Sequence, residues 1–76
     1  MEINIYIKTN RTKSGYARAR LTRFMNYSNN KIRYSFQFYQ THKFFNTYKE
    51  LRDYVMTNYE TYKGYQMPEE RDKFFS

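Results

Sequence analysis

Apolar and polar residues alternate one by one in three segments of this 76-residue chain, residues 2–8, residues 15–25 and residues 31–39. Alternation with a period of two places successive side chains on opposite sides of an extended backbone. Each segment is therefore predicted to be a β-strand with one buried and one exposed side. The connections are rich in Asn, Ser, Thr and Gly, which are typical of loops and turns. Because the connections are short, the three strands are expected to pair as an antiparallel meander.

The second segment breaks its own pattern. Up to Thr22 the apolar residues share one side, but Arg23 then falls among the apolar positions and Phe24 among the polar ones. A β-bulge near Thr22 and Arg23 would restore the phase. Alternatively the strand ends at this point, and the sequence leaves both interpretations open.

A helix is predicted over residues 48–62, because apolar residues recur there at helical spacing. Thr47 and Glu50 fit a capping box at its start, in which each side chain satisfies a free backbone N–H group of the other residue. Gly64 is suited to end the helix. Residues 68–75 are compatible with a short second helix, since they begin with a proline followed by acidic residues.

These elements predict an α+β fold, in which a three-stranded antiparallel β-meander packs on one C-terminal α-helix. Residues 1–76 are expected to form a single domain. A domain of this length buries only about 60% of the surface that its unfolded chain exposes. The chain has no Cys to form a disulfide, but its ten Tyr and seven Phe supply large rings for a core. A homodimer would also stabilise so small a unit. The expected core residues are Tyr34, Phe36, Phe38, Leu51, Val55 and Tyr59.

Charge is divided unevenly along the chain. The formal net charge is +7, and residues 3–49 contain ten Lys or Arg and no Asp or Glu. Residues 50–76 contain four basic and six acidic residues. A cationic block of this kind indicates binding to a polyanion. The alternative is a solvated surface that serves solubility alone, although solubility is usually served by both signs interspersed.

The side of the sheet that the helix leaves uncovered is predicted to collect three kinds of side chain. Cations neutralise phosphates and release counterions. Arg and Gln read base edges in a groove that admits β-strands, and Tyr stacks on unpaired bases. The alternative is that these residues serve β-propensity and cation–π pairing alone. The residues predicted to bind nucleic acid or another polyanion are Lys8, Arg11, Lys13, Tyr16, Arg18, Arg20, Lys31, Arg33, Gln37 and Tyr39.

Different roles are predicted within this set. Arg binds guanine and phosphate in a bidentate way, whereas Lys acts as a point charge. DNA is expected rather than RNA. The predicted roles are specific contacts for Arg18, Arg20 and Arg33, phosphate contacts for Lys8, Lys13 and Lys31, and stacking or positioning for Tyr16 and Tyr39.

The order of elements carries a resemblance. Three strands followed by a helix, with Gly15 and Tyr16 opening the second strand and residues 45–51 (FNTYKEL) leading into the helix, resemble the N-terminal arm-site DNA-binding domain of phage-type tyrosine recombinases. The resemblance covers about residues 3–62. It implies that the uncovered face of the sheet inserts into the major groove of DNA. The chain departs from that family because no catalytic domain follows the helix.

The chain also looks like a small phage or mobile-element protein, because it is short and rich in residues with AT-rich codons. Such genomes encode inhibitors of host defence, including anti-CRISPR proteins. Many of these inhibitors are acidic mimics of DNA, whereas this chain is basic. It would have to bind an acidic protein surface, or a nucleic-acid strand held in a nucleoprotein complex. Inhibition of a host defence complex is therefore the alternative function.

Catalysis has little support in the sequence. His42 is the only His, and it is expected in the connection between the third strand and the helix, with no carboxylate nearby in sequence. No Gly-rich phosphate loop, nucleophile elbow or metal-ligand cluster is evident. We therefore expect no enzyme activity, no cofactor and no metal. The sequence also has no apolar run long enough to span a membrane and no signal segment, so a cytoplasmic location is expected.

Overall fold

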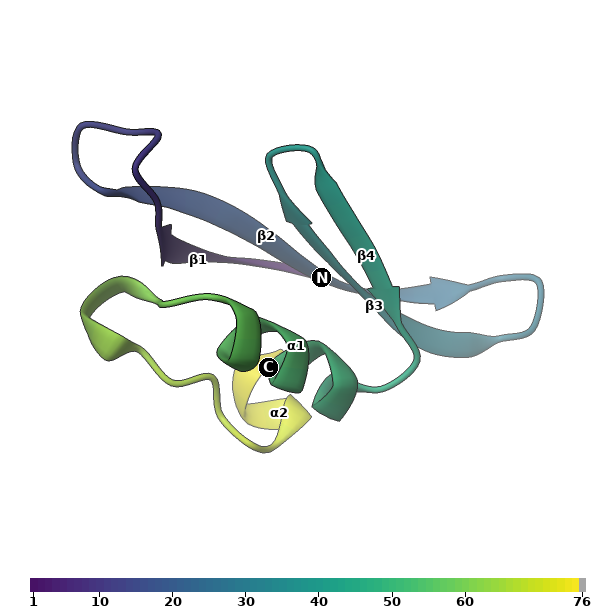
Figure 1. Ribbon diagram of the computed structural model, residues 1–76. Helices are drawn as coiled ribbons and strands as arrows, with labels where there is room; N and C mark the ends of the chain where they lie inside the picture. Colours follow the sequence, from purple (N-terminus) through teal and green to yellow (C-terminus); the bar gives the residue numbers. More distant parts are fainter. Residues whose placement is uncertain (76) are drawn as a thin grey trace.

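The computed structural model describes residues 1–75, in which one antiparallel sheet carries all the helical segments on the same side (Figure 1). The four strands follow one another across the sheet in chain order. The architecture is α+β, with a sheet layer and a helical layer. The elements are β1 (Glu2–Lys8), β2 (Tyr16–Asn26), β3 (Lys31–Phe38), β4 (Thr41–Phe45), α1 (Tyr48–Asn58), the 3-10 turn η1 (Tyr62–Gly64) and α2 (Arg71–Phe74).

The prediction of three strands is wrong, because the chain after β3 turns back and pairs with β3 as β4. Tyr39 makes the turn with a φ of 53°, so it lies beyond the end of β3. His42 consequently lies in a strand and not in a loop. β4 shows no alternation in sequence because it is an edge strand with little core to cover. Phe45 packs against the core, whereas Phe44 on the opposite side is 50% exposed.

Both interpretations of the phase change in β2 are wrong, because the register with β3 runs unbroken to the end of the strand. Arg23 does lie on the helix side, where its guanidinium carbon is 5.9 Å from the centre of the Phe75 ring. Phe24 lies on the opposite side. Alternation no longer separates buried from exposed residues here, because the helical layer does not extend over this end of β2 and β3. Met25 and Ile32 face the helix side yet are 45% and 39% exposed.

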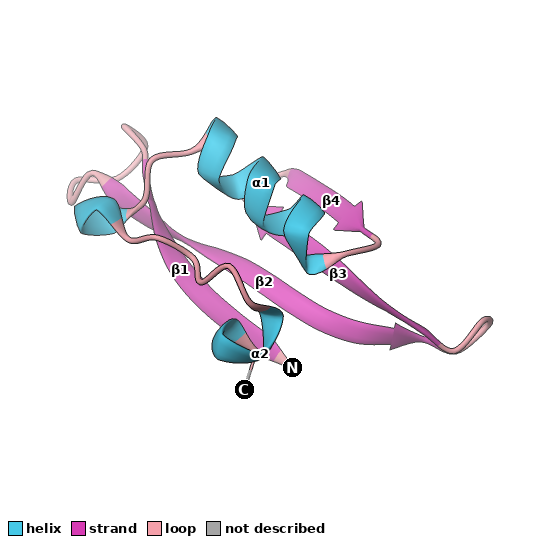
Figure 2. Ribbon diagram, turned by 90° about the horizontal axis from the view of Figure 1, so that it is seen from below, coloured by secondary structure: helices cyan, strands magenta, loops and turns pink. Residues whose placement is uncertain are grey.

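The core lies between the sheet and α1. Leu51 and Val55 of α1 are fully buried, as are Ile7, Leu21 and Phe36 of the sheet. Figure 2, which views the molecule from the helix side, shows α1 crossing the sheet while the chain after it runs along β1. Of the expected core residues, all but Tyr59 are buried, and Tyr59 is partly buried against the same cluster.

The C-terminal phenylalanines close the other end of this core. Phe74 and Phe75 are only 5% and 2% exposed. The Phe75 ring lies 5.8 Å from the Tyr34 ring and 6.1 Å from the Tyr48 ring, measured between centres. α2 is shorter than the predicted second helix, and its function is to place these two rings under the sheet.

The helix begins as predicted but ends earlier. Thr47 Oγ1 accepts a hydrogen bond from the backbone N–H of Glu50, although the Glu50 carboxylate accepts from the Thr47 hydroxyl and not from the backbone. α1 then stops at Asn58, and Gly64 ends the separate 3-10 turn η1 and not α1. The backbone N–H of Lys8 donates to the Glu60 carbonyl at 2.7 Å, so residues after α1 pair with the end of β1. No helix among residues 1–75 has the length and apolarity needed to cross a bilayer.

Tyr48 offers a test of the packing between α1 and the C-terminal segment. Its hydroxyl donates to the carbonyl of Pro68, and burial raises the pKa of Tyr48 to about 12. Because the folded-state pKa lies above the unfolded value of about 10, its stabilising effect is complete below pH 10 and is lost as the pH rises toward 12. We predict that Tyr48→Phe lowers the free energy of unfolding at pH 7 by about 1 kcal/mol and reduces the loss of stability above pH 10.

Urea unfolding followed by circular dichroism at neutral and alkaline pH measures both effects. Tyr27→Phe is the matched control, because Tyr27 is 88% exposed. The interpretation fails if Tyr48→Phe loses as much stability as the unsubstituted protein between pH 10 and pH 12.

Candidate nucleic-acid interface

The face of the sheet opposite α1 is uncovered, since the helical segments of residues 1–75 all lie on the other side (Figure 1). The strand registers fix which side chains share this face, because directly paired residues point the same way. We call it the open face. It consists of Glu2, Asn4, Tyr6 and Lys8 of β1, Tyr16, Arg18, Arg20, Thr22, Phe24 and Asn26 of β2, Lys31, Arg33, Ser35 and Gln37 of β3, and His42 and Phe44 of β4.

Seven of the ten predicted binding residues lie on the open face itself. The other three lie on the loops that border it, Arg11 and Lys13 between β1 and β2, and Tyr39 between β3 and β4. Figure 1 shows both connections rising on the side away from the helices. The two connections are in contact, because the guanidinium carbon of Arg11 lies 4.6 Å from the centre of the Tyr39 ring. The loop and the turn therefore enclose one end of the open face.

The centre of the open face is a polar hollow of about 260 Å³. Arg20 is held there by a hydrogen bond from Nη2 to Oε1 of Gln37, its neighbour on β3. Its other terminal nitrogen lies 3.8 Å from the carboxylate of Glu2. Arg18 also lines the hollow and forms no ion pair with any side chain of residues 1–75. Arg18 is thus the central cation whose charge is fully available to a ligand.

Arg33 is positioned by neutral groups toward the β4 side of the face. Its Nε–H donates to Oδ1 of Asn46 at 3.1 Å, and its guanidinium carbon lies 5.6 Å from the centre of the Phe44 ring. The Phe44 ring in turn lies 4.6 Å from that of His42 and 6.1 Å from that of Phe24. The sequence could not indicate these aromatic neighbours, because β4 itself was not predicted.

Lys8 and Tyr16, which are paired at the end of β1, each make a side-chain contact that the sequence did not predict. The Lys8 ammonium lies 3.5 Å from the carboxylate of Glu60. The rings of Tyr16 and Tyr62 are perpendicular, with centres 4.8 Å apart. Glu60 and Tyr62 belong to the stretch predicted as the end of the helix, which explains why sequence reasoning missed both contacts. The perpendicular contact leaves Tyr62 beside the open face, although helical spacing places it in the core.

Ser35 belongs to the open face but is only 7% exposed. In the sheet it lies between Thr22 of β2 and Phe44 of β4. Arg23 and Lys43 are the cations of the sheet that point to the helix side. Most of the cationic block therefore lies on one side of the molecule.

The described part of the chain shows no group of three or more His, Asp or Glu side chains that could hold a metal ion. Comparison with known proteins gives no match, since no family model, curated protein or solved structure proves similar to this chain. The resemblance to recombinase arm-site domains and to anti-CRISPR proteins therefore stays a prediction from the residues quoted above.

Proposed function

We propose that the protein binds nucleic acid through the open face, with DNA as the preferred ligand. One observation carries this proposal. Most of the arginines and lysines of the cationic block lie on or beside a sheet face that no helix of residues 1–75 covers, next to amide groups and aromatic rings. Phosphates are neutralised by such cations, and base edges are read by Arg and Gln.

The dimensions of β2 and β3 support insertion into a groove. A major groove of about 12 Å admits a two-stranded ribbon. β2 and β3 extend past both neighbouring strands. The pairs from Phe24↔Arg33 to Asn26↔Lys31 lie beyond the end of the pairing of β1 with β2 and of β4 with β3. At about 3.3 Å per residue, the ten steps from Tyr16 to Asn26 span about 33 Å, close to one turn of B-DNA.

DNA suits this ribbon better than double-stranded RNA. The major groove of an A-form RNA helix is deep and too narrow for side chains to read. Arg33 lies on the part of β2 and β3 that extends past both neighbouring strands, and Arg18, Arg20 and Gln37 lie further along the same two strands, where β1 or β4 flanks them. Lys8 and Lys13 lie to one side, where they would contact the phosphate backbone.

The double substitution Arg18→Ala with Arg33→Ala tests the proposal. We expect the affinity for duplex DNA to fall at least about 25-fold, because each bidentate arginine contributes about 1–3 kcal/mol. Fluorescence anisotropy over a salt series measures this loss, and binding by the unsubstituted protein should weaken steeply as salt rises.

The matched control removes two cations from outside the open face, Lys43→Ala with Lys73→Ala, and should retain affinity. A thermal melt verifies folding, because Arg33 also donates to Asn46. Unchanged binding by the arginine double variant would mean that DNA binds another part of the molecule, or not at all.

Glu2 gives a test in the opposite direction. Its carboxylate lies beside Arg20 and repels any phosphate that approaches the central hollow. We expect Glu2→Gln to tighten DNA binding about two- to fivefold, the effect of removing one surface charge. The same anisotropy assay compares it with Glu69→Gln, an exposed acid outside the open face. An equal gain in both variants would indicate a general charge effect and no site at Arg20.

A second candidate is inhibition of a host defence complex of the anti-CRISPR type. It is favoured by the apolar residues at the end of the β2–β3 hairpin, where Met25, Tyr27 and Ile32 are 45%, 88% and 39% exposed. Exposed apolar groups of this kind are typical of protein contacts. Under this function we expect purified DNA to bind weakly, and a defence complex to be retained on the immobilised protein after nuclease treatment. Retention that disappears with nuclease would argue for nucleic acid as the direct ligand.

A further inference from the structure

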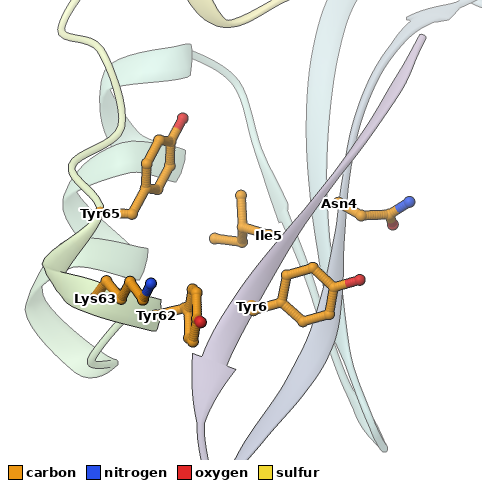
Figure 3. A pocket seen from close by; sticks show the side chains of 6 residues that line it. All are labelled: Asn4, Ile5, Tyr6, Tyr62, Lys63 and Tyr65. Atoms are coloured by element: carbon orange, nitrogen blue, oxygen red, sulfur yellow. The ribbon is translucent and has the colours of Figure 1, made fainter.

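A second hollow lies at the edge of the sheet beside β1, and its walls are tyrosine rings. It has a volume of about 420 Å³ and is lined by Asn4, Ile5, Tyr6, Tyr62, Lys63 and Tyr65. Figure 3 shows Tyr6 on one side of β1, and Tyr62, Lys63 and Tyr65 on the other. A smaller hollow of about 270 Å³ shares Tyr6 and Tyr62 and continues to Tyr16. We call the two together the tyrosine hollow.

Three tyrosine rings around this space remain partly exposed and are not packed into the small core. Tyr6, Tyr62 and Tyr65 are 53%, 43% and 42% exposed. The volume falls within the range of about 300–1,000 Å³ that is usual for sites that bind small molecules or single groups of a larger one. The hollow is therefore large enough to receive a planar ring system.

The turn that carries Tyr62 and Tyr65 is fixed by its backbone. Lys63 and Gly64 have φ values of 52° and 69°, in the left-handed region that is costly for a residue such as Lys. The backbone N–H of Gly64 donates to the Thr61 carbonyl, and that of Tyr65 donates to the Tyr62 carbonyl, each at 3.1 Å. The Thr61 hydroxyl also donates to the Tyr65 carbonyl. The backbone that carries the two rings is thus held in place before any ligand arrives, and the Tyr62 ring also packs on the Tyr16 ring.

The chemistry around the hollow matches an unpaired nucleotide. Tyrosine rings stack on bases of any sequence. The Lys63 ammonium, 5.3 Å from the centre of the Tyr62 ring, supplies a cation for a phosphate, and the Asn4 amide can pair with a base edge. The Tyr65 hydroxyl, which is protonated at neutral pH like that of any tyrosine, can also donate a hydrogen bond.

The hollow is continuous with the open face. Tyr6 lines the hollow and is paired in the sheet with Arg18, the central unpaired cation. A strand whose phosphates lie along the open face would pass directly over this edge. Bases within a duplex are stacked on both sides and cannot enter, so only an unpaired base fits.

We propose that the tyrosine hollow binds an unpaired base, so that the protein prefers DNA in which a single-stranded segment adjoins a duplex. This inference rests on the proposed function of the open face. It adds the class of substrate, a junction between double- and single-stranded DNA, and a second site that recognises the unpaired part.

The test compares three fluorescent probes by anisotropy: a blunt duplex, the same duplex with a short single-stranded overhang, and that duplex with an overhang of abasic residues. The unsubstituted protein should bind the overhang more tightly than the blunt duplex, and the abasic overhang should remove this preference. The preference should amount to about 5- to 150-fold, because base stacking on an aromatic ring contributes about 1–3 kcal/mol.

Tyr62→Ala should abolish the preference and leave affinity for the blunt duplex unchanged, whereas Tyr62→Phe should retain it because the ring remains. Tyr65→Ala provides the same test at a second ring of the hollow that lies outside the open face, should Tyr62→Ala disturb the contact with Tyr16. A preference that survives both alanine variants overturns this inference, while the proposed function stands. A loss on Phe44→Ala, with both tyrosine variants unaffected, would place the unpaired base at the β4 side instead and also overturns it. Failure of the unsubstituted protein to bind any of the three probes overturns the proposed function itself.

Discussion

The structure depends on the burial of one face of a sheet by one short helix and two C-terminal rings. Leu51, Val55 and Phe75 belong to one buried cluster with Phe36, Tyr34 and the isoleucines of β1, and this cluster is the core of the described residues. The strand pleat then leaves no choice for the residues in between, which must point to the opposite face. The same alternation that builds the core therefore gathers most of the arginines and lysines of the sheet on a single side, with Arg23 and Lys43 as the exceptions.

Gathering cations carries an electrostatic cost, and the open face limits it mainly with neutral groups. Arg20 is held by the amide of Gln37, Arg33 by the amide of Asn46, and Arg11 lies over the Tyr39 ring. Amides and rings orient a guanidinium without cancelling its charge. Among residues 1–75, Glu2 and Glu60 are the acids that form ion pairs with cations of this face, Arg20 and Lys8. The arginines are thus fixed in direction yet keep a positive field, as a polyanion site requires.

Strands covered by a helix could be predicted from the sequence, and elements at the margins could not. β1, the first half of β2 and β3 alternate because one side of each is buried, and Thr47 marks the helix start by local hydrogen bonding. β4 has too little buried surface to impose a pattern. The end of α1 depends on a distant partner, since residues near Glu60 pair with β1. For the same reason seven of the ten residues predicted to bind could be assigned to the open face, with the other three on the bordering connections, whereas the position of Tyr62 beside that face could be found only from the structure.

The β2–β3 hairpin reaches beyond the supported part of the sheet, and its final pairs lack a third strand and a helix beside them. A two-stranded ribbon of this kind has little stability of its own in water. Local opening of these last rungs therefore requires less free energy than unfolding of the core that holds Leu21 and Phe36. The molecule thus combines a rigid, helix-supported sheet with a less rigid hairpin end. This hairpin end can adapt to a curved or irregular surface at little cost to the stability of the fold.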